Sequence, residues 1–162
     1  MLLSLSDGTA VHVRPIAPED KPLLVAGLRT CSPQTIHRRF LAPKTRFSAA
    51  ELRYLTEVDG HDHIAYVALH DGALVAVARL VKTGPDFADV AIVVCDAWQG
   101  RGLGQQLTAL LARRGAQEGV RWIGATMLVD NRPALRVMRG LGDFVRDHTS
   151  HGVREVVALL AA

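Results

Sequence analysis

Apolar and polar positions alternate in several short runs of the chain, and such alternation predicts strands that bury one face. Val11 and Val13 alternate with polar neighbours and predict a strand over residues 9–14. The dipeptide Asp71-Gly72 separates two β-rich runs and is typical of a tight hairpin turn. The remaining strands are expected over residues 63–69, 74–81, 86–95, 122–129, 144–145 and 153–160.

Residues that favour helix starts mark the other elements. Pro18 begins one helix, and Ser32 is suited to be the N-cap of a second. The capping box Ser48–Glu51 begins a third helix. Leucines spaced by three or four residues predict a helix over residues 103–119, and Pro133 begins the last one.

The order of these elements predicts a single domain over residues 1–162. It runs as a strand, three helices, three strands, a helix, a strand, a helix and two strands. Such an order favours an α/β or α+β architecture, in which helices cover both faces of a mixed, mostly antiparallel sheet of about seven strands. The composition agrees, because 49% of the residues are hydrophobic and 22% are charged, as is typical of a globular chain with a core.

The charge balance and the cysteines narrow the class of protein. A net charge of +3 is too small to indicate a surface that binds nucleic acid. Cys31 and Cys95 lie far apart and form no paired motif, so neither a disulfide framework nor a zinc site is predicted. The N-terminal residues lack the pattern of a signal peptide, and no apolar run has membrane-spanning length. We therefore expect a cytoplasmic protein that binds neither nucleic acid nor membrane.

The clearest chemical signal lies between the strand over 86–95 and the helix over 103–119. The sequence there is Gln99-Gly100-Arg101-Gly102-Leu103-Gly104. Glycines let the backbone approach a ligand closely, and the free N–H groups of a following helix turn favour an anion, above all phosphate. The segment lacks the lysine of a P-loop and the third glycine of a dinucleotide fingerprint. What remains is the pattern Q-x-x-G-x-G.

In this context the pattern resembles the acetyl-CoA pyrophosphate loop of the GNAT superfamily of N-acetyltransferases, and the order of elements resembles the GNAT fold over essentially the whole chain. Residues 32–59 and 89–102 are similar to the acetyltransferase domain of bacterial Pat-type protein lysine acetyltransferases. The resemblance implies acetyl-CoA as the donor and CoA as a product. It also implies an amine acceptor, such as a protein lysine on an acyl-CoA synthetase.

The resemblance further implies a set of cofactor-binding residues. Backbone amides of the glycine loop would hold the pyrophosphate, and the exposed edge of the strand over 86–95 would pair with the pantetheine amides and offer an N–H to the thioester oxygen. Asn131 would hold the pantetheine, cap the helix that follows it, or do both. The full implied set is Ile92, Val93, Val94, Gln99, Gly100, Arg101, Gly102, Leu103, Gly104 and Asn131.

Asp89 occupies the position at which the family carries a catalytic Glu. A free lysine amine has a pKa of about 10.4, so a base must take its proton at neutral pH. Asp89 shares its strand face with apolar residues, so burial is expected to raise its pKa and make it a better base. Because Asp is one methylene shorter than Glu, a water would have to bridge its carboxylate and the amine. Met138 stands where relatives place a Tyr that protonates the leaving thiolate, so no general acid is assigned.

Other interpretations of these residues stay open. Asp89 and Met138 at the two catalytic positions favour a non-catalytic module that binds acyl-CoA, and a small-molecule amine is the alternative acceptor for an enzyme. The segment His61-Asp62-His63 has no further ligands nearby, so no metal is expected. His61 is instead a candidate substrate contact. Arg38 and Arg39 are expected to be solvated helix charges.

Overall fold

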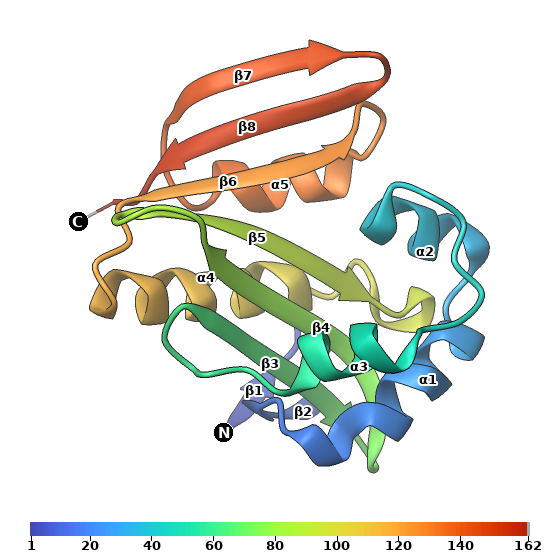
Figure 1. The fold of residues 1–162 in the computed structure, drawn as a ribbon. Coiled ribbons are helices and arrows are strands. Elements are labelled where there is room, and N and C mark those ends of the chain that lie inside the picture. Colours follow the sequence, from blue (N-terminus) through green and yellow to red (C-terminus); the bar gives the residue numbers. More distant parts are fainter. Residues whose placement is uncertain (162) are drawn as a thin grey trace.

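The computed structural model describes residues 1–161 as one sheet with helices on both faces (Figure 1). The strands lie in the order β1-β2-β3-β4-β5-β6-β8-β7. Every neighbouring pair is antiparallel except β5 and β6, which are parallel. The strands are β1 (Leu2–Ser4), β2 (Ala10–Pro15), β3 (His63–His70), β4 (Ala73–Lys82), β5 (Phe87–Val94), β6 (Trp122–Leu128), β7 (Phe144–Ser150) and β8 (Val153–Leu159).

The helices form two layers, with α1, α2 and α3 on one face of the sheet and α4 and α5 on the other (Figure 1). Their arrangement confirms the predicted fold class. None of the helices in residues 1–161 is long and apolar enough to cross a membrane. The α-helices are α1 (Lys21–Thr30), α2 (Pro33–Phe40), α3 (Ala49–Thr56), α4 (Leu103–Gln117) and α5 (Arg132–Arg139), and two short 3-10 turns are η1 (Pro18–Asp20) and η2 (Asp96–Trp98).

Two hairpins are closed by a residue pair with left-handed backbone angles. Asp71 and Gly72 have φ values of 49° and 77°, as the predicted tight turn between β3 and β4 requires. His151 and Gly152 have φ values of 52° and 76° and join β7 to β8 in the same way. The sequence did not suggest this second turn, because the residues before it show no alternation. The strand β7 extends to Ser150, well beyond the predicted residues 144–145. Apart from the half-buried Phe144, its side chains are exposed, which is why no alternating pattern marks it.

The largest core lies between the sheet and α4. Leu103, Leu107 and Leu111 form the inner face of that helix and are at most 1% exposed. They pack in one cluster with Leu80 of β4 and Ile123 of β6. Burial of these side chains fixes the position of α4 below β4 and β5, and thereby the position of the glycine loop from which α4 starts.

An ion pair between the buried Asp20 and the half-buried Arg14 fixes the start of the helical layer on the other face. Asp20 is 3% exposed, and its carboxylate accepts two hydrogen bonds from the Arg14 guanidinium, at 2.7 and 2.8 Å, and one from the Ala17 N–H at 2.8 Å. The hydrogen bonds from Arg14 hold the pKa of Asp20 below its ordinary value. The pair connects β2 to the turn that leads into α1.

We predict that Asp20→Asn lowers the free energy of unfolding by about 2 kcal/mol at pH 7, because charge-assisted hydrogen bonds to a buried group are lost. The lowered pKa of Asp20 means that its contribution is complete above the ordinary carboxyl pKa and disappears as the pH falls through the lowered one. Urea unfolding at neutral and acidic pH measures both effects. Glu57→Gln, in the exposed pair with Lys21, is the control and should change little. Equal stability of the Asn variant and the wild type at pH 7 would contradict the prediction.

Candidate active site

Strands β5 and β6 diverge and open the sheet. They pair at three positions only, the last of which is Asp89 opposite Gly124. From Val90 onward β5 still pairs with β4, as far as Val94. On its other side, however, no strand of the described part of the chain takes over. The outward N–H and C=O groups of this half of β5 are therefore available to a ligand.

A groove of about 480 Å³ lies along this free edge. It is bounded by α2, the second half of β5, the glycine loop and the start of α5. Of the residues that the sequence suggests for a cofactor, all but Arg101 line it. These are Ile92, Val93, Val94, Gln99, Gly100, Gly102, Leu103, Gly104 and Asn131.

The glycine loop presents the N-terminus of α4 to this groove. Gly100 and Gly102 have φ values of 72° and 82°, angles that side chains rarely adopt. Gly102 is the N-cap residue, and because it has no side chain, nothing caps the first N–H groups of the helix from within. The residues of that first turn, from Leu103 to Gln105, line the groove. The loop can therefore bind an anion at a helix start.

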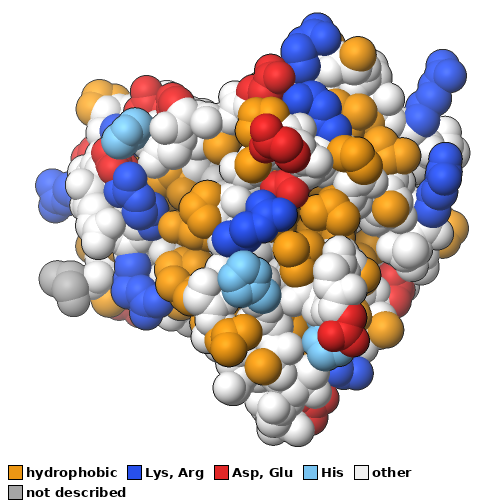
Figure 2. Space-filling model, turned by 90° about the horizontal axis from the view of Figure 1, so that it is seen from below, with side chains coloured by type: hydrophobic (Ala, Val, Ile, Leu, Met, Phe, Trp, Pro, Cys, Tyr) orange, Lys and Arg blue, Asp and Glu red, His pale blue; other side chains and the backbone are white. Residues whose placement is uncertain are grey.

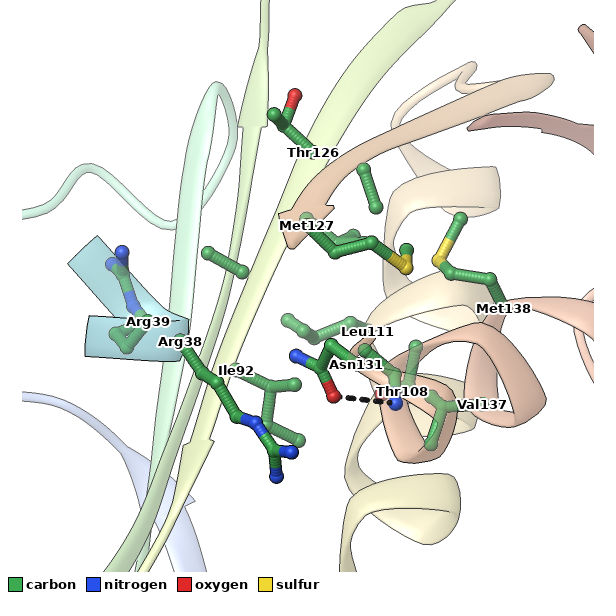
Figure 3. A pocket seen from close by; sticks show the side chains of 14 residues that line it. Arg38, Arg39, Ile92, Thr108, Leu111, Thr126, Met127, Asn131, Val137 and Met138 are labelled. Atoms are coloured by element: carbon green, nitrogen blue, oxygen red, sulfur yellow. Dashed lines mark hydrogen bonds between the residues drawn. The ribbon is translucent and has the colours of Figure 1, made fainter. Parts of the chain in front are cut away.

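Arginines add positive charge to the groove, and the sequence did not identify which ones. Arg38 and Arg136 line it, and neither forms a salt bridge within residues 1–161. Arg38 extends from α2 toward Ile92 and Asn131 (Figure 3). Arg101 instead stacks on the Trp98 ring, 4.8 Å from its centre, and pairs with Asp7, which lies outside the groove.

The expectation that Arg38 and Arg39 are simply solvated is wrong. Both line the groove, and Arg39 is half-buried beside Phe40, over whose ring its guanidinium lies at 4.7 Å. Burial lowers the pKa of Arg39. The helix pattern alone could not show this, because α2 covers β5 through contacts that are distant in sequence. Elsewhere the charges are mixed, and on the face in Figure 2 acidic and basic side chains alternate with hydrophobic ones.

Gln99 and Thr35 join α2 to the end of β5. The Gln99 side-chain amide donates to the Val94 carbonyl at 2.9 Å and to the Thr35 hydroxyl at 3.1 Å. Thr35 also lines the groove. No local pattern marks Thr35, because its role depends on a residue that lies 64 positions later. The two side chains fix the wall of the groove opposite α5.

A slot of about 60 Å³ lies at the fork where β5 and β6 diverge, and it shares Arg38, Ile92 and Asn131 with the groove (Figure 3). The slot begins one residue beyond the last β5–β6 pair, at Val90 on one strand and Ala125 on the other. Its far wall includes Met138, which is 2% exposed and packs in the core. The slot has room for a small group rather than for a whole cofactor, and its β5 wall begins at Val90, the residue after Asp89.

Asp89 lies at the fork, on the sheet face that α2 and α3 cover. Its carboxylate rests against bare backbone, since a Cβ added at Gly124 would lie 2.7 Å from its Oδ1 and 2.8 Å from the Phe87 ring. The side chain stays open to solvent on the other side. Partial burial raises the pKa of Asp89, and the negative charge of Glu155 raises it further. The direction of this shift agrees with the expectation from the sequence and suits a base.

Asn131 has the capping geometry that the sequence allowed. Its Oδ1 accepts a hydrogen bond from the Ala134 N–H at 3.3 Å, which makes it the N-cap of α5. The amide nitrogen points the other way, toward β5 (Figure 3). The cap therefore leaves the N–H₂ group of Asn131 free to face a ligand in the groove.

His61 lines neither the groove nor the slot. Its ring nitrogen Nδ1 is 3.3 Å from the Glu118 carboxylate, at the C-terminal end of α4. The glycine loop is at the opposite end of that helix. The candidate substrate contact at His61 thus stays a prediction, while His63, two residues later, faces the α3 side and lies 2.9 Å from Arg79.

Comparisons with known proteins agree on one family. The acetyltransferase (GNAT) family pattern matches residues 33–143. Acetyltransferase Pat of Mycolicibacterium smegmatis is 36% identical over 140 residues, which cover 83% of this chain and 41% of that protein. Acetyltransferase PA5475 of Pseudomonas aeruginosa is 30% identical over 163 residues, covering 98% of this chain and 87% of that protein. The chain spans about two fifths of the length of the Mycolicibacterium relative.

Solved structures give the same result at the level of the fold. The GNAT domain of S. lividans PAT superposes with a TM-score of 0.91 at 29% identity, covering 99% of this chain and 96% of that one. The yncA protein of Salmonella typhimurium, solved with its cofactor acetyl-CoA, has a TM-score of 0.75 at 15% identity, covering 94% and 95%. At that identity the second likeness is one of fold alone.

Proposed function

Because the chain belongs to the GNAT family of acetyltransferases, we propose that it transfers the acetyl group of acetyl-CoA to an amine, and that the amine is a lysine side chain of another protein. The observation that carries the proposal is that Asp89 forms the last β5–β6 pair and directly precedes Val90, where the slot begins. A base lies there at the point where a ligand paired along β5 would end. Its pKa is raised by burial and by Glu155.

The groove residues fit an elongated anion that carries amides. The uncapped start of α4 and the cations Arg38 and Arg136 suit phosphates. The free edge of β5 and the Asn131 N–H₂ group suit the amides of pantetheine. Acetyl-CoA combines these two features, and its acetyl end would enter the slot at the fork.

Asp89 removes a proton from the incoming ammonium, directly or through one water, so that the neutral nitrogen attacks the thioester carbon. A backbone N–H of Val93 or Val94 donates to the carbonyl oxygen as charge builds up on it, and such a donor contributes roughly 3 kcal/mol. Collapse breaks the carbon–sulfur bond and releases CoA with an N-acetylated product. Met138 cannot donate a proton, so the thiolate is protonated by water.

Two features favour a protein as the acceptor. Asp89 faces open solvent rather than a closed chamber, so a lysine on a large surface can reach it. Asp89 and Glu155 also place two carboxylates near the fork, and their negative charge attracts an ammonium group. The resemblance of residues 32–59 and 89–102 to Pat-type protein lysine acetyltransferases favours the same choice. An acyl-CoA synthetase lysine is one candidate, and a small-molecule amine is the second.

The other interpretation is a domain that binds acyl-CoA without chemistry. Met138, which lies in the core, has no proton to donate, and the lack of a general acid at this position favours that alternative. Release of free CoA in the presence of acceptor proteins or amines separates the two. Binding without CoA release for any acceptor would support the non-catalytic module.

We predict that acetyl-CoA at about 100 times its dissociation constant stabilises the wild type by roughly 2.7 kcal/mol. Gly102→Glu should abolish this stabilisation, because it places bulk and negative charge at the start of α4. Gly102→Ala controls for backbone strain at φ 82°, and Gln117→Glu controls for added charge at the far end of the helix. Thermal unfolding with and without acetyl-CoA measures the shift. An unchanged melting temperature of the wild type in millimolar acetyl-CoA would refute the cofactor assignment.

We predict that Asp89→Asn lowers kcat/KM for an amine acceptor by roughly 10²-fold or more at neutral pH, with little change in acetyl-CoA affinity. The loss should shrink at high pH, where the amine deprotonates without a base. Asp89→Glu restores the residue usual in the family and should retain activity. Asp86→Asn, on the segment before β5, is the matched control. Steady-state release of CoA is the assay, and wild-type turnover by Asp89→Asn at pH 7 would show that Asp89 is not the base.

A further inference from the structure

Two thiols that play no part in the reaction lie next to each other behind β5. The sulfurs of Cys31 and Cys95 are 3.1 Å apart, although the residues are 64 positions apart in sequence. Both side chains are buried, in a cluster with Ile36. They are the two cysteines of the whole chain. No pattern in the sequence pairs them, since they are neither close together nor part of a recognised motif.

We propose that Cys31 and Cys95 are a redox-modification site, at which a small peroxide converts the two thiols into a reversible disulfide that links the start of α2 to the end of β5.

The backbone around the two cysteines is already held side by side. Cys31 directly precedes Ser32, the N-cap of α2, and Cys95 directly precedes Asp96. The Ser32 N–H and hydroxyl both donate to the Asp96 carboxylate, at 2.9 and 2.7 Å. Because the next residue on each side is fixed in this way, the two segments stay together and keep the sulfurs within reach of each other.

The chemistry of the pair suits oxidation. The Cys31 thiol donates a hydrogen bond to the Cys95 sulfur, and this bond lowers the pKa of Cys95. Both thiols line a cavity of about 40 Å³, which is large enough for a peroxide-sized molecule. Arg39 and Arg79 line the same cavity. A reagent that reaches the cavity therefore meets the more acidic thiol and its resolving thiol together.

The disulfide forms in two steps. The Cys95 thiolate attacks one oxygen of hydrogen peroxide, the O–O bond breaks, and Cys95 becomes a sulfenic acid while hydroxide leaves. The Cys31 sulfur then attacks the sulfenic sulfur, the S–O bond breaks, and its thiol proton leaves with the oxygen as water. Overall two electrons pass from the cysteines to the peroxide. A dithiol reductant reverses the result.

The disulfide would act on the wall of the groove. It would close a loop across α2, α3, β3, β4 and β5, which includes the elements that carry Asp89 and Arg38. Thr35 and Gln99, the other link between α2 and the end of β5, lie just beyond the two cysteines. Oxidation should therefore fix α2 against the groove and stabilise the fold.

The test treats the reduced wild-type protein with a small excess of hydrogen peroxide, alkylates it after denaturation and measures its intact mass. The expected product has lost two hydrogen atoms and takes up no alkylating agent. A dithiol reductant should restore both alkylation sites. The oxidised protein should melt roughly 5 °C or more above the reduced one. Formation in the folded protein should be roughly tenfold or more faster than in concentrated urea, since the fold holds the thiols together.

Cys31→Ser and Cys95→Ser are the matched variants. The same treatment should add oxygen to the remaining cysteine of Cys31→Ser and should leave Cys95→Ser much less reactive. The wild-type mass decides the question even where a variant fails to fold. Two alkylated thiols after peroxide treatment, or oxygen added to each without loss of two hydrogens, would overturn the proposal. Disulfide formation as fast in urea as in the folded state would overturn it as well.

Discussion

The structure depends on the point at which β5 stops pairing with β6. The hydrogen bonds between the two strands end at Asp89 and Gly124, and beyond them one edge of β5 is left without a strand. Polar backbone groups along a groove need partners, and an extended ligand with its own amides can supply them. The parallel pairing that ends early therefore creates the groove, the slot and the position of Asp89 at the same time. The sheet of this chain is mostly antiparallel and is arranged around this one parallel pair, which ends early.

The charges on the two sides of the fork are opposite in sign. The uncapped start of α4, Arg38 and Arg136 make the groove favourable for a polyanion. The carboxylates of Asp89 and Glu155, near the fork, make that side favourable for an ammonium group. In the proposed reaction a phosphate-bearing donor and a cationic acceptor would each be attracted to its own side. The acyl group would then pass between them at the slot.

Local signals in the sequence were sufficient for most of the fold and for the outline of the groove. The Asp71-Gly72 turn, the capping residues and the glycine loop each act within a few residues, and the structure confirms the elements that they predict. The features that were missed depend on distant contacts. The short edge strand β1 and the exposed β7 bury too little to leave an alternating pattern. The position of Arg39 in the groove wall depends on how α2 covers β5, which no window of the sequence contains.

Hydrogen exchange with and without acetyl-CoA tests the central claim most directly, because it monitors the free edge of β5 itself. If the pantetheine completes that edge, the backbone amides of residues 90–94 and of the first turn of α4 should become protected when acetyl-CoA binds. The amides of β7 and β8, which lie away from the groove, should exchange at unchanged rates. Protection that is absent from residues 90–94, or that appears instead around His61, would contradict the account.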